Sequence, residues 1–500
     1  MSQGEPPLLP LVLWRVPPAL PAMLAQEGVA FVELDDRPAA LTQAGRFVVH
    51  DSRREPTSRL ARLIAADQVL FDVDRLRSGW RNDPFAAWLD TRAALRCWKI
   101  GNNRLYERVN RHDRAALRHR VVDALRDWVI AQGGVWACLA PFPYPYRSAF
   151  CLRIDLDEPC EADYWPFASR RKPLDDCTSH FVSTAAYGQL PRVLDDLRQL
   201  DTHSHGHHHV VYRTPAANRR NLERADALLR AAGITPRGFA APEGRWNPGL
   251  DDAIESLGYG FSSEFQVGYD DLPFFAWRGN GFSRVLQIPI HPLCEGLFLQ
   301  AGARDGQAIA DHLTAVIDSR VALGLPAFIY GHPEHRLGRF PEIVEAVART
   351  VQHQTGLWRT TFGAFATWWR WRLARRWSLT RDDGTLCVTL ANPSPEFTAC
   401  LTIDRGGPTA TIPLWKPRTW FRQEDLVYRG VRMLKEPSPR RPPPRLLRIR
   451  PLARACLECL VDWETVTPCH ELPESTILQR WKKHLRGHRD RLAERRTARR

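Results

Sequence analysis

The chain has 500 residues, a formal charge of +14 and a pI near 9.6. It is too long for one ordinary domain, so we expect two to four domains, and its positive charge favours anionic partners such as nucleic acid, acidic membranes or acidic sugars. The eleven cysteines lack a framework spacing, which favours reduced thiols in a cytosol over a secreted disulfide scaffold. The N-terminus reads MSQGEPPLLPLVLW, without a basic leader, and no apolar run approaches ~20 residues. We therefore expect a cytoplasmic protein without an integral membrane segment, peripheral at most.

Residues 1–145 are expected to form a small α/β and helical domain. Short apolar runs predict strands, and the run between the last two predicts a helix; the strands are Gly28–Leu34, Arg46–His50 and Gln68–Val73, and the helix is Ser58–Ala66. From Pro84 the pattern becomes helical, with a periodic apolar face that ends at Gly133 and Gly134. The strand-end acids Asp35, Asp36 and Asp51 are interpreted as solvated turn residues. The proline-rich segment 141–147 then predicts a linker.

An apolar run at 149–152 ends in the acids of RIDLDEP, which are Asp155, Asp157 and Glu158. A buried strand that ends in carboxylates points them at a site. Strand alternation sends Asp155 and Asp157 to one face and Glu158 to the other, so the first two are expected to act together.

The segment from Asp201 to Arg213, DTHSHGHHHVVYR, carries five histidines within seven residues. His205 and His209 are four residues apart, as are His203 and His207. This spacing brings two ring nitrogens to the same side of a helical turn or tight loop, as a metal ion requires. The alternative is a solvated histidine-rich loop without a metal.

Two more apolar segments end in polar turns, GFAAPEGRW at 238–246 and AFIYGHPEH at 327–335. Between these motifs, apolar strand-like segments follow amphipathic helices that close at glycines; the helices are Asn218–Ala232, Pro248–Leu257 and Gln307–Leu323. This alternation predicts a parallel sheet over residues 148–372, and several polar strand ends suggest the mouth of a barrel.

Residues 378–430 contain short β-branched runs separated by turns, which predict a small β-rich appendage that packs on the barrel or binds sugar. Residues 431–500 form a basic, Pro- and Arg-rich tail, expected to dock on polyanions or an anionic membrane surface. Within it, Cys456, Cys459, Cys469 and His470 offer one CxxC and a CH, which is a weak zinc signal without a second CxxC.

Together the barrel motifs resemble the polysaccharide deacetylase family, the NodB-homology or carbohydrate-esterase-type deacetylases. The resemblance implies a distorted (β/α) barrel that holds one divalent metal ion, with Zn²⁺ expected, by one Asp and two His. The family's first motif makes Asp155 the base and Asp157 the metal ligand, although here Leu156 separates them. Its second motif, SHGxxH, matches residues 204–209 and selects His205 and His209 as the other ligands.

The same resemblance makes the strand-end His332 the general acid. The third motif departs from the family, because Ala240 stands where an arginine usually orients the catalytic Asp. We expect Arg245 to reach Asp155 from the other side of the turn. The remaining residues of this motif are expected on the substrate side; they are Pro242, Glu243, Gly244 and Trp246.

The implied function is a metal-dependent hydrolase that removes an N-acyl group, expected to be acetyl, from an amino sugar. Without an export signal, the expected substrate is a cytosolic sugar precursor or a lipid-linked intermediate. Two alternatives stay open. One is an O-acetyl esterase on the same barrel, and the other is a catalytically impaired binding or scaffolding protein that docks on anionic surfaces.

Overall fold

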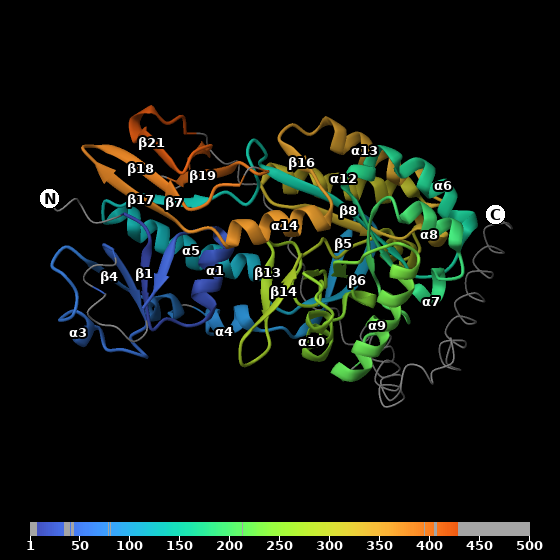
Figure 1. Ribbon diagram of the computed structural model, residues 1–500, viewed down its shortest axis with the longest axis horizontal. Coiled ribbons are helices and arrows are strands. Elements are labelled where there is room, and N and C mark those ends of the chain that lie inside the picture. Colours follow the sequence, from blue (N-terminus) through green and yellow to red (C-terminus); the bar gives the residue numbers. More distant parts are fainter. Residues whose placement is uncertain are drawn as a thin grey trace.

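The computed structural model describes residues 8–428, apart from 35–40, 42–44, 79, 81, 213, 395 and 405–407. The predicted basic tail, its cysteine cluster and the acids Asp35 and Asp36 lie outside the described residues. Figure 1 shows the barrel at one end of the molecule, and the first and last described segments side by side at the other. Among the described residues, no helix is both long and apolar enough to cross a membrane.

The first segment begins with a four-stranded parallel sheet in the order β2-β1-β3-β4. Its strands are β1 (Leu11–Trp14), β2 (Phe31–Glu33), β3 (Phe47–His50) and β4 (Val69–Asp72), and the elements around them are α1 (Ala19–Glu27), α3 (Thr57–Leu60), the 3-10 turn Val73–Arg77, α4 (Pro84–Leu89) and α5 (Arg114–Ala131). The predicted strands and the helix before Gly133 are confirmed. The helix predicted at 58–66 is only one turn long, and the central strand β1 was not predicted.

The helical pattern predicted from Pro84 is interrupted by a β-hairpin, β5 (Ala93–Ile100) and β6 (Asn103–Asn110). The prediction of a helix is wrong here because the side chains point alternately to the two faces of the hairpin, with the period of two that is typical of strands. Trp98 and Leu105 face each other across the hairpin and are buried against the barrel, while the charged neighbours Lys99 and Arg104 are exposed.

The barrel is a curled, nearly all-parallel sheet in the order β13-β14-β12-β11-β10-β9-β8-β15, with β16 also paired to β8. Only β13 is antiparallel to its neighbour. Its strands are β8 (Ser148–Leu156), β9 (Thr178–Val182), β10 (Asp201–Ser204), β11 (Gly238–Phe239), β12 (Phe261–Ser262), β13 (Phe274–Trp277), β14 (Phe282–Gln287), β15 (Ala327–Gly331) and β16 (Leu357–Arg359). This mixed α/β fold is the predicted distorted barrel.

Helices connect the parallel strands and cover the sheet (Figure 1). They are α6 (Glu161–Arg171), α7 (Thr184–Tyr187), α8 (Pro191–Leu197), α9 (Pro215–Ala231), α10 (Pro248–Ser256), α11 (Glu295–Gln300), α12 (Gly306–Ala322), α13 (Pro341–His353) and α14 (Phe362–Leu373), with short turns at Lys172–Cys177, Pro242–Gly244 and Pro333–Leu337. The three predicted amphipathic helices are confirmed as α9, α10 and α12. Side chains of Thr214, Asn247 and Asp305 accept backbone hydrogen bonds and cap their first turns.

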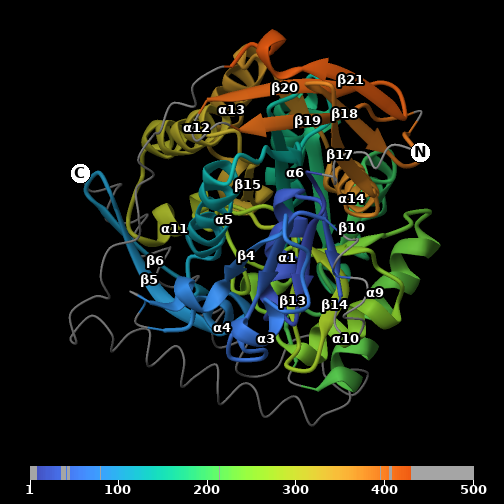
Figure 2. The same cartoon turned by 90° about the vertical axis from the view of Figure 1, so that its left-hand side faces the viewer.

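The C-terminal strands form two small antiparallel sheets, β17-β18-β21 and β20-β19-β7. They comprise β17 (Trp377–Asp382), β18 (Thr385–Leu390), β19 (Ala399–Asp404), β20 (Thr409–Leu414) and β21 (Arg418–Arg422), followed by a turn at Gln423–Asp425, whereas β7 (Trp136–Leu139) comes from the first segment. Figure 2 shows these sheets above the N-terminal sheet. The two segments share one hydrophobic core, separate from the barrel core.

Buried charges join this shared unit to the barrel. Arg118 on α5 is fully buried and donates to Asp271 of the barrel at 2.7 Å and to Glu27 of α1 at 2.8 Å. Arg372 of α14 donates to the carbonyl groups of Ala25 and Gln26 at the end of α1. These contacts fix the barrel against the rest of the chain.

Candidate active site

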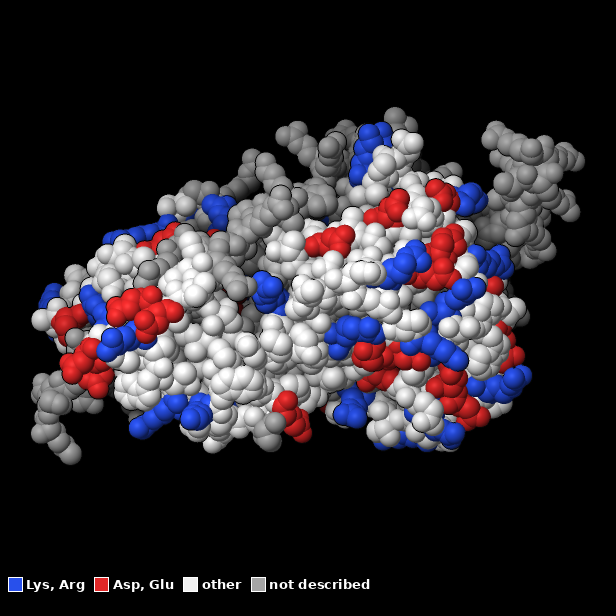
Figure 3. Space-filling view, turned by 90° about the horizontal axis from the view of Figure 1, so that it is seen from above, with Lys and Arg blue, Asp and Glu red and all other residues white. Residues whose placement is uncertain are grey.

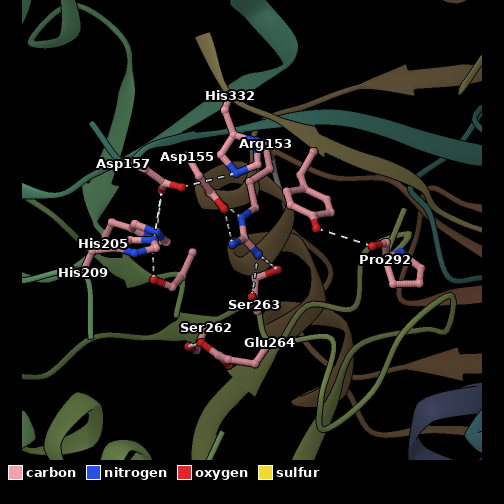
Figure 4. Close-up of polar contacts among 12 residues, drawn as sticks. Arg153, Asp155, Asp157, His205, His209, Ser262, Ser263, Glu264, Pro292 and His332 are labelled. Atoms are coloured by element: carbon pink, nitrogen blue, oxygen red, sulfur yellow. Dashed lines mark hydrogen bonds and ion pairs between the residues drawn. The ribbon is translucent and has the colours of Figure 1, made fainter. Parts of the chain in front are cut away.

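Asp157 and two histidines of the predicted metal site meet beside the ends of β8 and β10 (Figure 4). The Nε2 atoms of His205 and His209 each lie 3.1 Å from the same Asp157 oxygen, Oδ1. Asp157 Oδ1 and His205 Nε2 are buried, yet neither makes a hydrogen bond with any described residue. Buried polar atoms without a hydrogen bond are costly, and a cation bound between them would remove this cost. One carboxylate with two imidazoles suits a zinc-like ion with open positions.

The backbone around His205 fixes the orientation of the imidazole ring. Its Nδ1–H donates to the carbonyl of Ala240 at 2.7 Å, which leaves the Nε2 lone pair facing Asp157. Gly206 follows in the left-handed region, with a φ of 87°, where a side chain would also collide with Asn221. The Asn221 side chain accepts from the backbone N–H of His208 at 2.8 Å and holds the loop that returns His209 to the site.

The alternative histidine pair lies elsewhere. The His203 ring pairs with Asp201 at 3.0 Å, inside the barrel wall, and the His207 ring contacts the Thr184 hydroxyl at 2.9 Å. Of the two pairs with a four-residue spacing, the structure therefore brings only 205 and 209 to Asp157.

Asp155 lies buried beside the cluster of Asp157, His205 and His209, and its cation partner differs from the expected one. Both of its carboxylate oxygens accept from the guanidinium of Arg153, at 2.7 and 2.5 Å. Arg245 instead lies 3.4 Å from Glu243 in the turn after β11. The expectation that Arg245 holds Asp155 is thus corrected, because residues two apart on a strand face the same side.

The charge of Asp155 follows from this contact. Burial raises the pKa of Asp155, but Arg153 and His205 outweigh it and hold the pKa below its ordinary value. Burial likewise raises the pKa of Asp157, and the nearby His209 and His332 bring it well below the usual range. Both acids are therefore carboxylates at neutral pH.

His332 follows β15, the strand paired with β8, and its Nε2 lies 3.6 Å from Asp157 Oδ2. Its Nδ1–H and its backbone N–H both donate to Glu295 Oε1, at 2.8 and 2.9 Å. Burial and Arg336 lower the pKa of His332, but Asp157 and Glu295 outweigh them and raise it well above the ordinary value. The sequence analysis did not identify Glu295, the first residue of α11, because no motif surrounds it.

The four residues expected on the substrate side have different surroundings. Pro242 and Gly244 are buried in the turn after β11, and a side chain at Gly244 would collide with the Phe265 ring. Glu243 pairs with Arg245, and Trp246 packs against the cluster of Val267, Phe274 and Ala276. The turn thus forms the wall beside β11, and Asp155 takes its cation from Arg153.

A further buried acid lies below Arg153 (Figure 4). Glu264 is 1% exposed, and the Ser262 hydroxyl donates to its Oε1. Burial is the main cause that raises the pKa of Glu264 to about 8. This carboxyl is therefore mostly neutral at pH 7.

No family model and no curated protein matches this chain. Solved structures similar to it include a probable polysaccharide deacetylase from Pseudomonas aeruginosa, with 19% identity, 45% of this chain and 91% of that chain covered, and a TM-score of 0.40. The Puue allantoinase has 19% identity, 46% and 93% coverage, and a TM-score of 0.40. A CE4 family pseudoenzyme from Bacillus anthracis has 11% identity, 44% and 65% coverage, and a TM-score of 0.31. These similarities concern the barrel fold alone.

Proposed function

We propose that this protein is a metal-dependent hydrolase that removes an N-acyl group, acetyl above all, from an amino sugar. The observation that carries the proposal is the convergence of His205 and His209 on one oxygen of Asp157. A catalytic metal site needs three protein ligands and open positions, and it needs a base and an acid nearby. Asp155 and His332 flank this group.

Asp157, His205 and His209 would hold one divalent ion, with Zn²⁺ the expected choice. When bound, such an ion supplies Lewis-acid activation of water and of the scissile carbonyl. Asp155, ionised and held by Arg153, takes the proton released as water adds to the acyl carbon. His332, protonated and oriented by Glu295, donates its Nε2 proton to the departing amine nitrogen. The products are a carboxylic acid and a free amine.

The proposal also covers the class of substrate and the place where the protein meets it. The same base and acid would also cleave an O-acetyl ester, whose alkoxide leaving group needs protonation less than an amine does. The expected substrate is a cytosolic or lipid-linked sugar precursor, and the chain's +14 charge supports attraction to anionic carriers. Figure 3 shows basic and acidic side chains interspersed over the barrel end on the face seen from above. We assign docking on an anionic surface to the basic, Pro- and Arg-rich residues 431–500.

Metal analysis and acetate release test the proposal together. Purified wild type should carry about one transition metal per chain and release acetate from N-acetylglucosamine conjugates, His205→Ala should lose the metal, and Asp155→Asn should keep the metal but lose turnover. Equal metal content in wild type and His205→Ala would contradict the metal site. Metal-loaded wild type no faster than Asp155→Asn on all N- and O-acyl sugars would instead favour a non-catalytic protein.

A further inference from the structure

The carboxylate of Asp155 is held from within its own strand. Arg153 and Asp155 are two residues apart on β8, so both side chains point to the same side, and the two oxygens accept from Nε and Nη2 of the guanidinium. This bidentate geometry fixes the carboxylate plane as well as its charge. The two residues are only 1% and 3% exposed.

Other barrel strands fix the guanidinium in turn. Arg153 Nη1 donates to the Ser263 carbonyl at 2.6 Å, and the Ser263 hydroxyl lies 3.3 Å away (Figure 4). The rings of Phe181 and Tyr330 lie on neighbouring strands, each 5.4 Å from the guanidinium carbon. Arg153 therefore has little freedom to turn away from Asp155.

The turn after β11 offers no substitute. Ala240, which replaces the arginine expected by family resemblance, is fully buried, and its carbonyl accepts from His205. Arg245, the other cation of this turn, lies beside Glu243.

We propose that Arg153 is the positioning residue for the base Asp155, and that an arginine inside the first barrel strand replaces the missing turn arginine. The catalytic part of this inference rests on the proposed function, whereas the pairing itself does not. RIDLD would then be a self-contained unit, with the cation and the base on one side of β8 and the metal ligand directly after the strand ends. Substitutions in the turn after β11 should leave the orientation of the Asp155 carboxylate unchanged.

The kinetic test compares Arg153→Met and Arg153→Lys with a matched control, Arg171→Met. Arg171 is also a buried barrel arginine, but it pairs with Asp175 at 2.7 Å. Losing the orientation of a base should lower kcat by about 10²-fold, with KM changed less than about threefold and metal content unchanged. Lysine, which keeps the charge but not the bidentate fork, should restore part of kcat, and Arg171→Met should keep it. Arg153→Met with unchanged kcat, or a loss reproduced by Arg245→Ala alone, would overturn the inference.

A second measurement does not require activity. Melting temperatures of Arg153→Met, Asp155→Asn and the double variant form a thermodynamic cycle. If the pair exists, the double variant should lose clearly less than the sum of the two single losses. Additive losses would overturn the inference even in an inactive protein, whereas coupled losses with an inactive wild type would reject the proposed function alone.

Discussion

The buried acid Glu264 makes a quantitative prediction about stability and pH. Its carboxyl is enclosed next to Ser262 and has a folded pKa of about 8, against an ordinary value of 4.5. The folded protein therefore keeps a proton there that the unfolded chain releases. A carboxyl whose pKa is higher in the folded state than in the unfolded chain destabilises the folded protein at high pH. The free energy of unfolding should therefore fall as the pH rises from about 4.5, and it should level off above about 8.

The size of the effect follows from those two pKa values. At about 1.4 kcal/mol per pH unit, the full cost above pH 8 is about 5 kcal/mol. About 3 kcal/mol of this loss in the free energy of unfolding falls between pH 6 and pH 9, where it can be measured. Glu264→Gln keeps the shape and a hydrogen-bonding group for Ser262 but cannot ionise, so it should lack this loss.

Denaturant unfolding of wild type and Glu264→Gln at pH 6 and pH 9 measures the difference. Wild type should lose about 3 kcal/mol more than the variant over this interval. Glu334, also buried and with a pKa raised to about 8, adds the same trend to both proteins and cancels in the comparison. Equal pH dependence of the two proteins would refute the reasoning, because it would mean that Glu264 does not keep its proton in the folded state.

Three further predictions concern the site and its support. Glu295→Gln should lower kcat by about 10-fold to 10²-fold at unchanged metal content, because the His332 ring loses the carboxylate that orients it; unchanged kcat would contradict this role. Chelation should lower the melting temperature of wild type but not of His205→Ala, since a bound ion stabilises only the folded protein; an equal response in both proteins would place the metal elsewhere. Arg118→Met leaves Asp271 buried without its cation and should cost about 3–5 kcal/mol in a denaturant titration; a loss under 1 kcal/mol would show that the interface tolerates the change.

The convergence of Asp157, His205 and His209 was predictable because its signals are local. Asp155 and Asp157 end an apolar strand, and SHGHHH is a dense motif in which His205 and His209 return to the same point after one turn. Arg153 could also have been found, since strand periodicity places it beside Asp155, but closeness in sequence to the missing turn arginine favoured Arg245. Glu295 could not, because its contact with His332 joins positions 37 residues apart without any pattern.

The fold shows the same limit. Helices α9, α10 and α12 were predictable from capping residues and an amphipathic period, both of which are local. Strand β1 was missed because its apolar run is short and prolines stand close to it in the sequence. In the sheet it is fully buried and lies between β2 and β3. The pairing of β7 with β19 depends on residues more than 260 positions apart, and no periodicity reports such a contact.

The pairing of β7 with β19 determines the order in which the parts of the chain can fold during synthesis. Trp136 and Leu139 of β7 are buried by a sheet whose other strands are translated only after the entire barrel. The buried residues of the barrel core all precede the end of α14, whereas the N-terminal segment up to β7 shares its core with β17 to β20, which are synthesised later. A stalled or shortened chain would thus release a finished barrel attached to a half-built, aggregation-prone partner, and protection of the N-terminal segment should appear only with the emergence of β19.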